Sequence, residues 1–118
     1  MNTSELIGAA LDWAVAKCES NIALSSVQDI GGQLRANNNG ESIRYAPSTD
    51  WAVGGPIIER ESILLDKYPD GGWVGQKWIS DELMSAYEEG GPTPLIAAMR
   101  CYVASKLGDE VAIPDELE

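Results

Sequence analysis

The stretch that decides the fold is residues 93–108, TPLIAAMRCYVASKLG, because it carries each signal of an α-helix at the expected position. Thr93 can cap the N-terminus, and Pro94 suits the first helical position. Lys106 falls in the last turn, where a cation is favoured, and Gly108 follows as a terminator. The sequence therefore predicts a helix over about 94–107.

Both sides of this helix are poor in charge. One side is an apolar stripe, and the opposite side is made of small residues: Ala97, Ala98, Cys101, Ala104 and Ser105. A side that faces solvent is normally charged, so the helix is expected to be covered on both sides. The cover would come from its own domain or from a second subunit in a homodimer.

A β-hairpin is predicted upstream of this helix. Residues 63–68 and 73–79 flank the tetrapeptide Pro69-Asp70-Gly71-Gly72. Proline and aspartate start turns, and glycine accepts a positive φ. The pattern favours two paired strands, followed by a short helix over 81–89 that ends at Gly90-Gly91.

A second amphipathic helix is predicted at the N-terminus, over residues 4–19. Thr3 or Ser4 is available as a cap, and apolar residues recur at helical spacing at Ile7, Leu11, Ala14, Val15 and Cys18. Glu5, Asp12 and Glu19 recur every seven residues on the other side. We interpret that side as the solvated face that an amphipathic helix needs.

The pattern is weak over residues 20–40, where we expect a short helix ending at Gly31-Gly32 and then a loop or turn at Asn37-Asn38-Asn39-Gly40. Residues 42–45 alternate polar and apolar side chains and stop before Pro47, as a short strand does.

Together these elements predict an α+β fold in which N- and C-terminal helices pack on a small antiparallel sheet containing a β-hairpin. The chain of 118 residues, with 44% hydrophobic and 23% charged residues, is typical of a single folded domain, 1–118. Its acidic tail, 109–118, is expected to run over the surface or to fray.

Composition excludes several classes of function. The chain has no histidine, so the usual general base near neutral pH and the commonest transition-metal ligand are missing. Eight basic and nineteen acidic residues give a net charge of −11, which disfavours direct binding to duplex nucleic acid. No apolar run is long enough for a membrane-spanning helix, and no export signal is visible. We expect no cofactor and no metal site.

The two cysteines, Cys18 and Cys101, both fall in predicted helices. They are expected to be free, reduced thiols that pack as small hydrophobic side chains, with a disulfide between them as the alternative.

The segment between Pro47 and Pro56 is rich in turn formers and is predicted to be an ordered surface loop, with Pro56 in the first turn of a short helix through Arg60. Trp51 in this loop is the first candidate for ligand contact, because an indole stacks on a base. Arg44 or Arg60 would neutralise a phosphate. The alternative is that Trp51 fills the core. The candidate ligand-binding residues are Arg44, Thr49, Asp50, Trp51, Gly54, Gly55 and Arg60.

Three blocks of sequence resemble the NinX-like family of small tailed-phage and prophage proteins. They are LDWAVAK at 11–17, PSTDW at 47–51 with GPIIE at 55–59, and GPTPLIAAMR at 91–100. Residues 20–40 carry none of the resemblance. It implies an accessory protein made in the cytoplasm of the bacterial host during phage growth, and it implies no reaction and no catalytic residue.

Three functions are compatible with these observations. The first is a non-catalytic binder that captures a small anionic host molecule, such as a nucleotide-derived immune signal. The second is a protein-binding inhibitor of a host enzyme that uses its acidic surface. The third, which we rank below the other two, is a magnesium-dependent enzyme acting on a nucleotide through Asp50, Glu59 and Glu61. A solvated surface cluster is the favoured explanation of these carboxylates.

Overall fold

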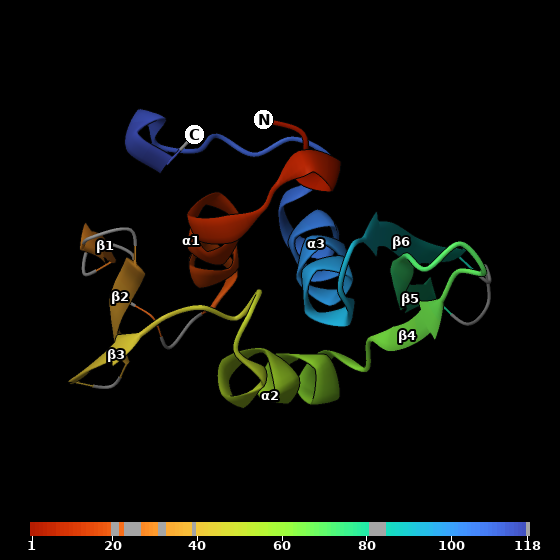
Figure 1. Cartoon of the computed structure of the whole chain (residues 1–118), viewed down its shortest axis with the longest axis horizontal. Helices are drawn as coiled ribbons and strands as arrows, with labels where there is room; N and C mark the ends of the chain where they lie inside the picture. The colour runs from red at the N-terminus through yellow and green to blue at the C-terminus, as the bar shows by residue number, and fades with distance from the viewer. Residues whose placement is uncertain (20–21, 23–26, 31–32, 39, 81–84, 118) are drawn as a thin grey trace.

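The computed structural model of the chain has an α+β fold in which three helices lie between two small sheets (Figure 1). It describes the whole chain except residues 20–21, 23–26, 31–32, 39, 81–84 and 118. The elements are η1 (Thr3–Glu5), α1 (Gly8–Cys18), β1 (Gln28–Ile30), β2 (Gln33–Asn38), β3 (Glu41–Arg44), α2 (Trp51–Glu61), β4 (Leu64–Lys67), β5 (Trp73–Ser80), β6 (Ser85–Gly91), α3 (Pro94–Leu107) and η3 (Asp115–Leu117). Each sheet is antiparallel, with strand orders β1-β2-β3 and β4-β5-β6. The predicted α+β fold with antiparallel strands is confirmed, and the strands form two sheets.

The C-terminal helix is confirmed with its predicted bounds and caps. The hydroxyl of Thr93 accepts a hydrogen bond of 3.2 Å from the backbone N–H of Ile96, and Pro94 opens α3. Side chains of α1 and α3 form the centre of the core, among them Leu11, Val15, Met99, Tyr102 and Val103.

The small residues on the back of α3 lie against the second sheet. A Cβ added to Gly75 of β5 would lie 2.8 Å from the carbonyl oxygen of Ala97, and one added to Gly91 of β6 would lie 2.7 Å from the backbone nitrogen of Ala97. Such close approach requires glycine in the strands and a small side chain in the helix. The cover of α3 therefore comes from within the chain: α1 packs on one side and β5 and β6 on the other.

The hairpin is also confirmed. Lys67 pairs with Trp73 across the turn, and the N–H of Tyr68 donates to the carbonyl of Gly72 at 2.7 Å. Gly71 has φ of 101°, which explains the glycine at that position.

The expected helices at residues 20–32 and 81–89 are wrong where the structure describes those residues. β1 and β2 pair in an antiparallel ladder, and Asn37 and Asn38 belong to β2. The predicted turn is confirmed at Gly40, and Asn39 lies outside the described residues. Residues 85–91 form β6, which pairs with β5 and covers α3, while residues 81–84 lie outside the described residues. Packing on a neighbouring element has overridden local propensity at both places.

The N-terminal helix begins later than predicted. A 3-10 turn precedes it, and α1 starts at Gly8, whose φ of 61° redirects the chain. The hydroxyl of Thr3 does not cap the helix but donates to the carbonyl of Gly108 at 2.7 Å. Ile7, expected in the apolar stripe, is the N-cap residue and is 55% exposed.

The first part of the acidic tail is held in place rather than frayed. The N–H of Val111 donates to the carbonyl of Met1 at 3.0 Å, and the N–H of Thr3 donates to that of Asp109 at 2.8 Å. Val111 and Ile113 are buried. The two termini therefore stabilise each other across the top of the view in Figure 1.

Cys18 and Cys101 are free thiols, so the alternative of a disulfide is wrong. Within the described part of the chain, no helix combines the length and the hydropathy needed to cross a membrane.

Candidate functional site

The predicted loop between Pro47 and Pro56 is wrong from Trp51 onward, because helix α2 begins there, while residues 47–49 form a turn. The carboxylate of Asp50 caps this helix by accepting a 3.0 Å hydrogen bond from the N–H of Ala52. Pro56 therefore lies inside α2 and not at its start. A proline there removes one backbone donor, which the cap and the packing of α2 offset.

Gly54, a candidate ligand-binding residue, is buried where α2 packs on its neighbours. A Cβ at this position would overlap the carbonyl oxygen of Pro47 and would lie 2.7 Å from Cδ2 of Leu95. Gly55 has no such constraint, since its nearest neighbour would be Cε3 of Trp51 at 3.9 Å. Packing alone explains the glycine at position 54.

Trp51 is 54% exposed, so the interpretation that it fills the core is wrong. The ring lines a cavity of about 220 Å³ between the N-termini of α2 and α3, together with Ser48, Thr49, Thr93, Pro94, Leu95 and Ile96. We refer to it as the Trp51 cavity. Among the described residues, no arginine lines it.

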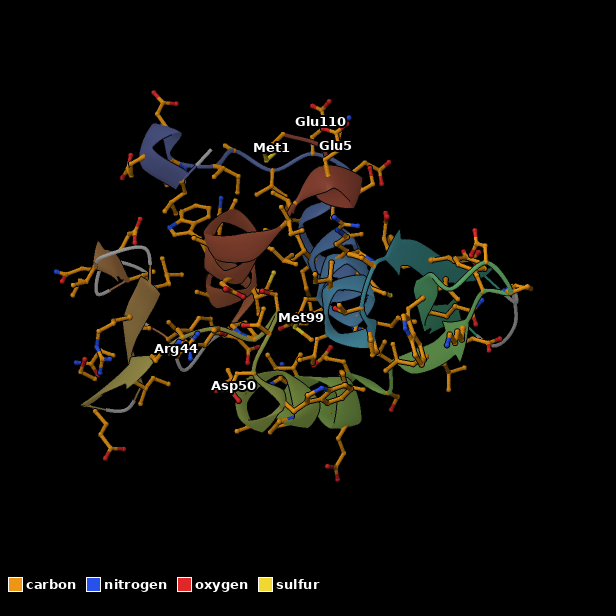
Figure 2. The ribbon with its side chains drawn as sticks, viewed as in Figure 1. Met1, Glu5, Arg44, Asp50, Met99 and Glu110 are labelled. Carbon is orange, nitrogen blue, oxygen red and sulfur yellow. The ribbon has the colours of Figure 1, made fainter. Side chains whose placement is uncertain are left out.

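Arg44 lines a different cavity, of about 150 Å³, which we refer to as the Arg44 cavity. Its walls are Gly8, Ala9, Asp12, Leu34, Arg44, Ala46 and Thr49. Figure 2 shows Arg44 between β3 and the start of α2, where Asp50 is labelled. The Arg44 side chain is exposed and makes no ion pair or hydrogen bond with any other residue that the structure describes. Its guanidinium is therefore available to a ligand.

The N-terminus of α1 forms another wall of the Arg44 cavity. Gly8 and Ala9 belong to its first turn, and no side chain caps it. The first N–H groups of a helix have no partner within the helix and carry a partial positive charge. An uncapped N-terminus beside a free guanidinium is a setting that attracts anions.

Asp12 is the residue of this cavity that sequence reasoning missed. Its side chain is only 6% exposed, so its assignment to a solvated face is wrong. One carboxylate oxygen accepts a 2.9 Å hydrogen bond from the N–H of Ser48. Burial raises the pKa of Asp12 to about 6, against the opposing effects of the hydrogen bonds from Ser48 and the charge of Arg44. A signal was present: residues 9–16, AALDWAVA, are apolar on every side of the helix except at Asp12.

Thr49 lines both cavities. It is an exposed residue in the turn between β3 and α2. Of the predicted site residues, the structure thus brings together Arg44, Thr49 and Trp51, with Asp50 beside them as the cap of α2.

Arg60 lies apart from this group. Its guanidinium binds Glu19 at 2.6 Å and Glu61 at 2.8 Å and donates to the hydroxyl of Tyr102 at 3.2 Å. Hydrogen bonds to Glu19 and Glu61 raise the pKa of Arg60. Burial would raise the pKa of Glu61, but hydrogen bonds from Lys77 and Arg60 outweigh it and lower the pKa to about 2. The guanidinium of Arg60 is thus held in ion pairs within the chain. Arg60 lines a third cavity, of about 260 Å³, whose lining includes neither Arg44 nor Trp51.

The three carboxylates considered for magnesium do not form a site. Asp50 precedes α2 and Glu61 ends it, which separates them by about 15 Å along the helix. Glu59 is exposed, and Glu61 is bound by Arg60 and Lys77. Within the described residues, no group of three histidine, cysteine or acidic side chains could hold a metal ion. The geometry gives the enzyme hypothesis no support.

One comparison with known proteins gives a match. The family model described as bacteriophage P22 NinX matches residues 2–106, whereas no curated protein matches the chain. The matched part includes α1, α2, all of α3 except its last residue, and every residue of the Arg44 and Trp51 cavities, and it stops before the acidic tail.

Proposed function

The chain belongs to the bacteriophage P22 NinX family, and we propose that this phage protein captures a small anionic molecule of its host without catalysing a reaction. The candidate ligand is a nucleotide-derived immune signal in the cytoplasm of the infected bacterium. The observation that carries the proposal is that Thr49 lines two cavities, one with an exposed indole and the other with a guanidinium that makes no ion pair or hydrogen bond among the described residues.

The Arg44 cavity supplies the chemistry for a phosphate. Arg44 provides planar donors that match phosphate oxygens, and the first turn of α1 provides backbone N–H groups at Gly8 and Ala9. The hydroxyl of Thr49 adds a further donor. The backbone of Arg44 belongs to β3 and that of Gly8 and Ala9 to α1, so little backbone ordering is needed on binding.

The Trp51 cavity supplies the chemistry for a base. Stacking of a base on an aromatic ring contributes roughly 1–3 kcal/mol. Leu95 and Ile96 form an apolar wall beside the ring, and Ser48 and Thr49 bring hydroxyl groups to it. A ligand that spans the two cavities would place its ring against Trp51 and its phosphate against Arg44.

The net charge of −11 affects how such a ligand arrives. An acidic protein repels anions at long range, so we expect association to speed up as salt screens the repulsion. Binding would then depend on the local donors and not on the overall field. This salt dependence is opposite to that of proteins that bind nucleic acid through a basic surface.

The test is native mass spectrometry together with thermal denaturation, using ADP-ribose and a cyclic dinucleotide as probes. Wild-type protein should gain the mass of at least one probe and melt at a higher temperature in its presence. Arg44→Ala and Trp51→Ala should each weaken binding at least ten-fold.

Arg35→Ala is the matched control. Arg35 lies opposite Arg44 in the β2–β3 ladder and its guanidinium donates to the carbonyl of Ser42, but it does not line either cavity. Its removal changes the net charge as Arg44→Ala does and should leave binding unchanged. Failure of both probes to bind, or equal losses in the two arginine variants, would refute the proposal.

A further inference from the structure

We infer that Asp12 couples the capture of an anion in the Arg44 cavity to the uptake of one proton. This inference rests on the proposed function, because it concerns the same cavity. It goes beyond that function by stating how the site is regulated by pH.

The geometry places a carboxylate in the wall of a cavity whose other groups attract anions. Asp12 is buried, and one of its carboxylate oxygens accepts a 2.9 Å hydrogen bond from the N–H of Ser48. Gly8, Ala9 and Arg44 line the same cavity of about 150 Å³. An anion bound in so small a space would come close to the carboxylate, and two negative charges that close disfavour each other strongly.

The other groups that face Asp12 cannot remove this conflict. From β3 the cavity has Arg44, which the bound anion would itself engage. From the following segment the cavity has the uncharged Ala46 and Thr49. Outside the cavity lining, the N–H of Ser48 donates to Asp12, and burial raises the pKa of nearby Tyr45, so its hydroxyl stays neutral. From β2 it has the apolar Leu34, and α1 itself adds Gly8 and Ala9, which carry no charge. Arg44 is therefore the only positive side chain lining the cavity within the described residues.

A proton on Asp12 resolves the conflict. The neutral carboxyl group donates an O–H to the bound anion instead of repelling it. Burial already raises the pKa of Asp12 to about 6, so the proton costs little near neutral pH. A bound anion raises that pKa further, because it adds a like charge and engages Arg44.

The sign of the pH dependence follows. Below about pH 6, Asp12 is already protonated in the free protein, and the affinity is constant. Above that pH the proton must be taken up on binding, so the affinity falls by up to about ten-fold per pH unit.

The experiment uses inorganic sulfate and ADP-ribose, whose charges do not change in this range, with affinities measured by NMR titration between about pH 5.5 and about pH 7.5. For wild-type protein we expect the affinity to fall several-fold to about ten-fold between about pH 6.5 and about pH 7.5. Asp12→Asn keeps an oxygen that accepts from Ser48 but cannot titrate, so its affinity should be independent of pH and tighter than wild type at the upper end.

A second measurement needs no variant. Calorimetry of wild-type protein in two buffers with different heats of ionisation reports the number of protons taken up on binding, which should approach one near pH 7.5. Binding without proton uptake, or an Asp12→Asn protein that keeps the pH dependence, would overturn the inference and leave the proposed function standing. Absence of binding to both probes at every pH, in wild type and in Asp12→Asn, would overturn the proposed function itself.

Discussion

Replacing Gly54 by alanine should destabilise the protein, whereas the same replacement at the adjacent Gly55 should stabilise it. Both glycines lie inside α2, and in the sequence they look equivalent. The structure separates them, because a Cβ at position 54 overlaps Pro47 and crowds Leu95, while one at position 55 meets its nearest neighbour at 3.9 Å.

The expected magnitudes combine two opposing effects. Alanine is favoured over glycine inside a helix by about 1 kcal/mol, and this gain applies at both positions. Overpacking typically costs about 1–3 kcal/mol, and the overlapping atom at Gly54 is a backbone oxygen that cannot rotate away. Because that atom is backbone, we expect the overpacking cost at Gly54 to lie at about 2–3 kcal/mol. Gly54→Ala should then lower the free energy of unfolding by about 1–2 kcal/mol, and Gly55→Ala should raise it by about 0.5–1 kcal/mol.

Urea denaturation followed by circular dichroism measures both changes. In thermal denaturation, 1 kcal/mol corresponds to a shift of roughly 4 °C for a domain of this size. A Gly54→Ala protein as stable as wild type would refute the tight packing of α2 on the segment that carries Pro47. Equal destabilisation by both variants would indicate that residues 51–55 are a loop after all.

Three further predictions concern stability. Arg60→Ala removes the cation that pairs with the carboxylate of Glu19, which is 8% exposed, and should lower the free energy of unfolding by about 1–2 kcal/mol. The control, Arg44→Ala, should change the free energy of unfolding by less than about 0.5 kcal/mol, and urea denaturation measures both. The pKa of Asp12 is raised on folding from 3.8 to about 6, so its contribution is present below about pH 4 and is lost as the pH rises through 6. Between about pH 4 and about pH 7, wild type should lose up to about 3 kcal/mol more unfolding free energy than Asp12→Asn, and equal pH profiles would contradict this. Thr93→Ala should cost about 1 kcal/mol through loss of the cap on Ile96, and Thr93→Ser should restore most of it.

The elements that the sequence predicts correctly are those fixed by local signals. The helix at 94–107 carries its own cap, first-turn proline and terminating glycine, and the hairpin carries its own turn. Each of these signals acts within a few residues, so it can be recognised without knowing the neighbours.

The elements that the sequence misses depend on contacts with other elements of the fold. Gly54 and Pro56 look like loop residues, but they lie in α2, where Gly54 packs against Pro47 and Leu95. Residues 85–89 fall in the expected helix over 81–89, but they belong to β6, which completes a sheet over α3. These contacts leave no mark on local propensity, and tertiary packing decides both cases.

Only part of the candidate site could be predicted from the sequence, because its residues are brought together by the fold. Trp51 and Arg44 stand out as an aromatic and a cation near turn formers, and the structure places both beside Thr49. Asp12 and the N-terminus of α1 could not be connected with them, because 32 residues separate Asp12 from Arg44 and only the fold brings them to one cavity. The guanidinium of Arg60 could also bind a phosphate, but it already forms ion pairs with Glu19 and Glu61.

The most direct test of the central claim is an NMR titration of the isotopically labelled protein with ADP-ribose. One ligand that spans the two cavities should contact both the first turn of α1 and the Trp51 ring. We therefore predict that the amide signals of Gly8, Ala9 and Thr49 and the indole signal of Trp51 shift together, with one dissociation constant. Shifts confined to the surroundings of Arg60, or no shift at the Trp51 indole while the amides move, would contradict it.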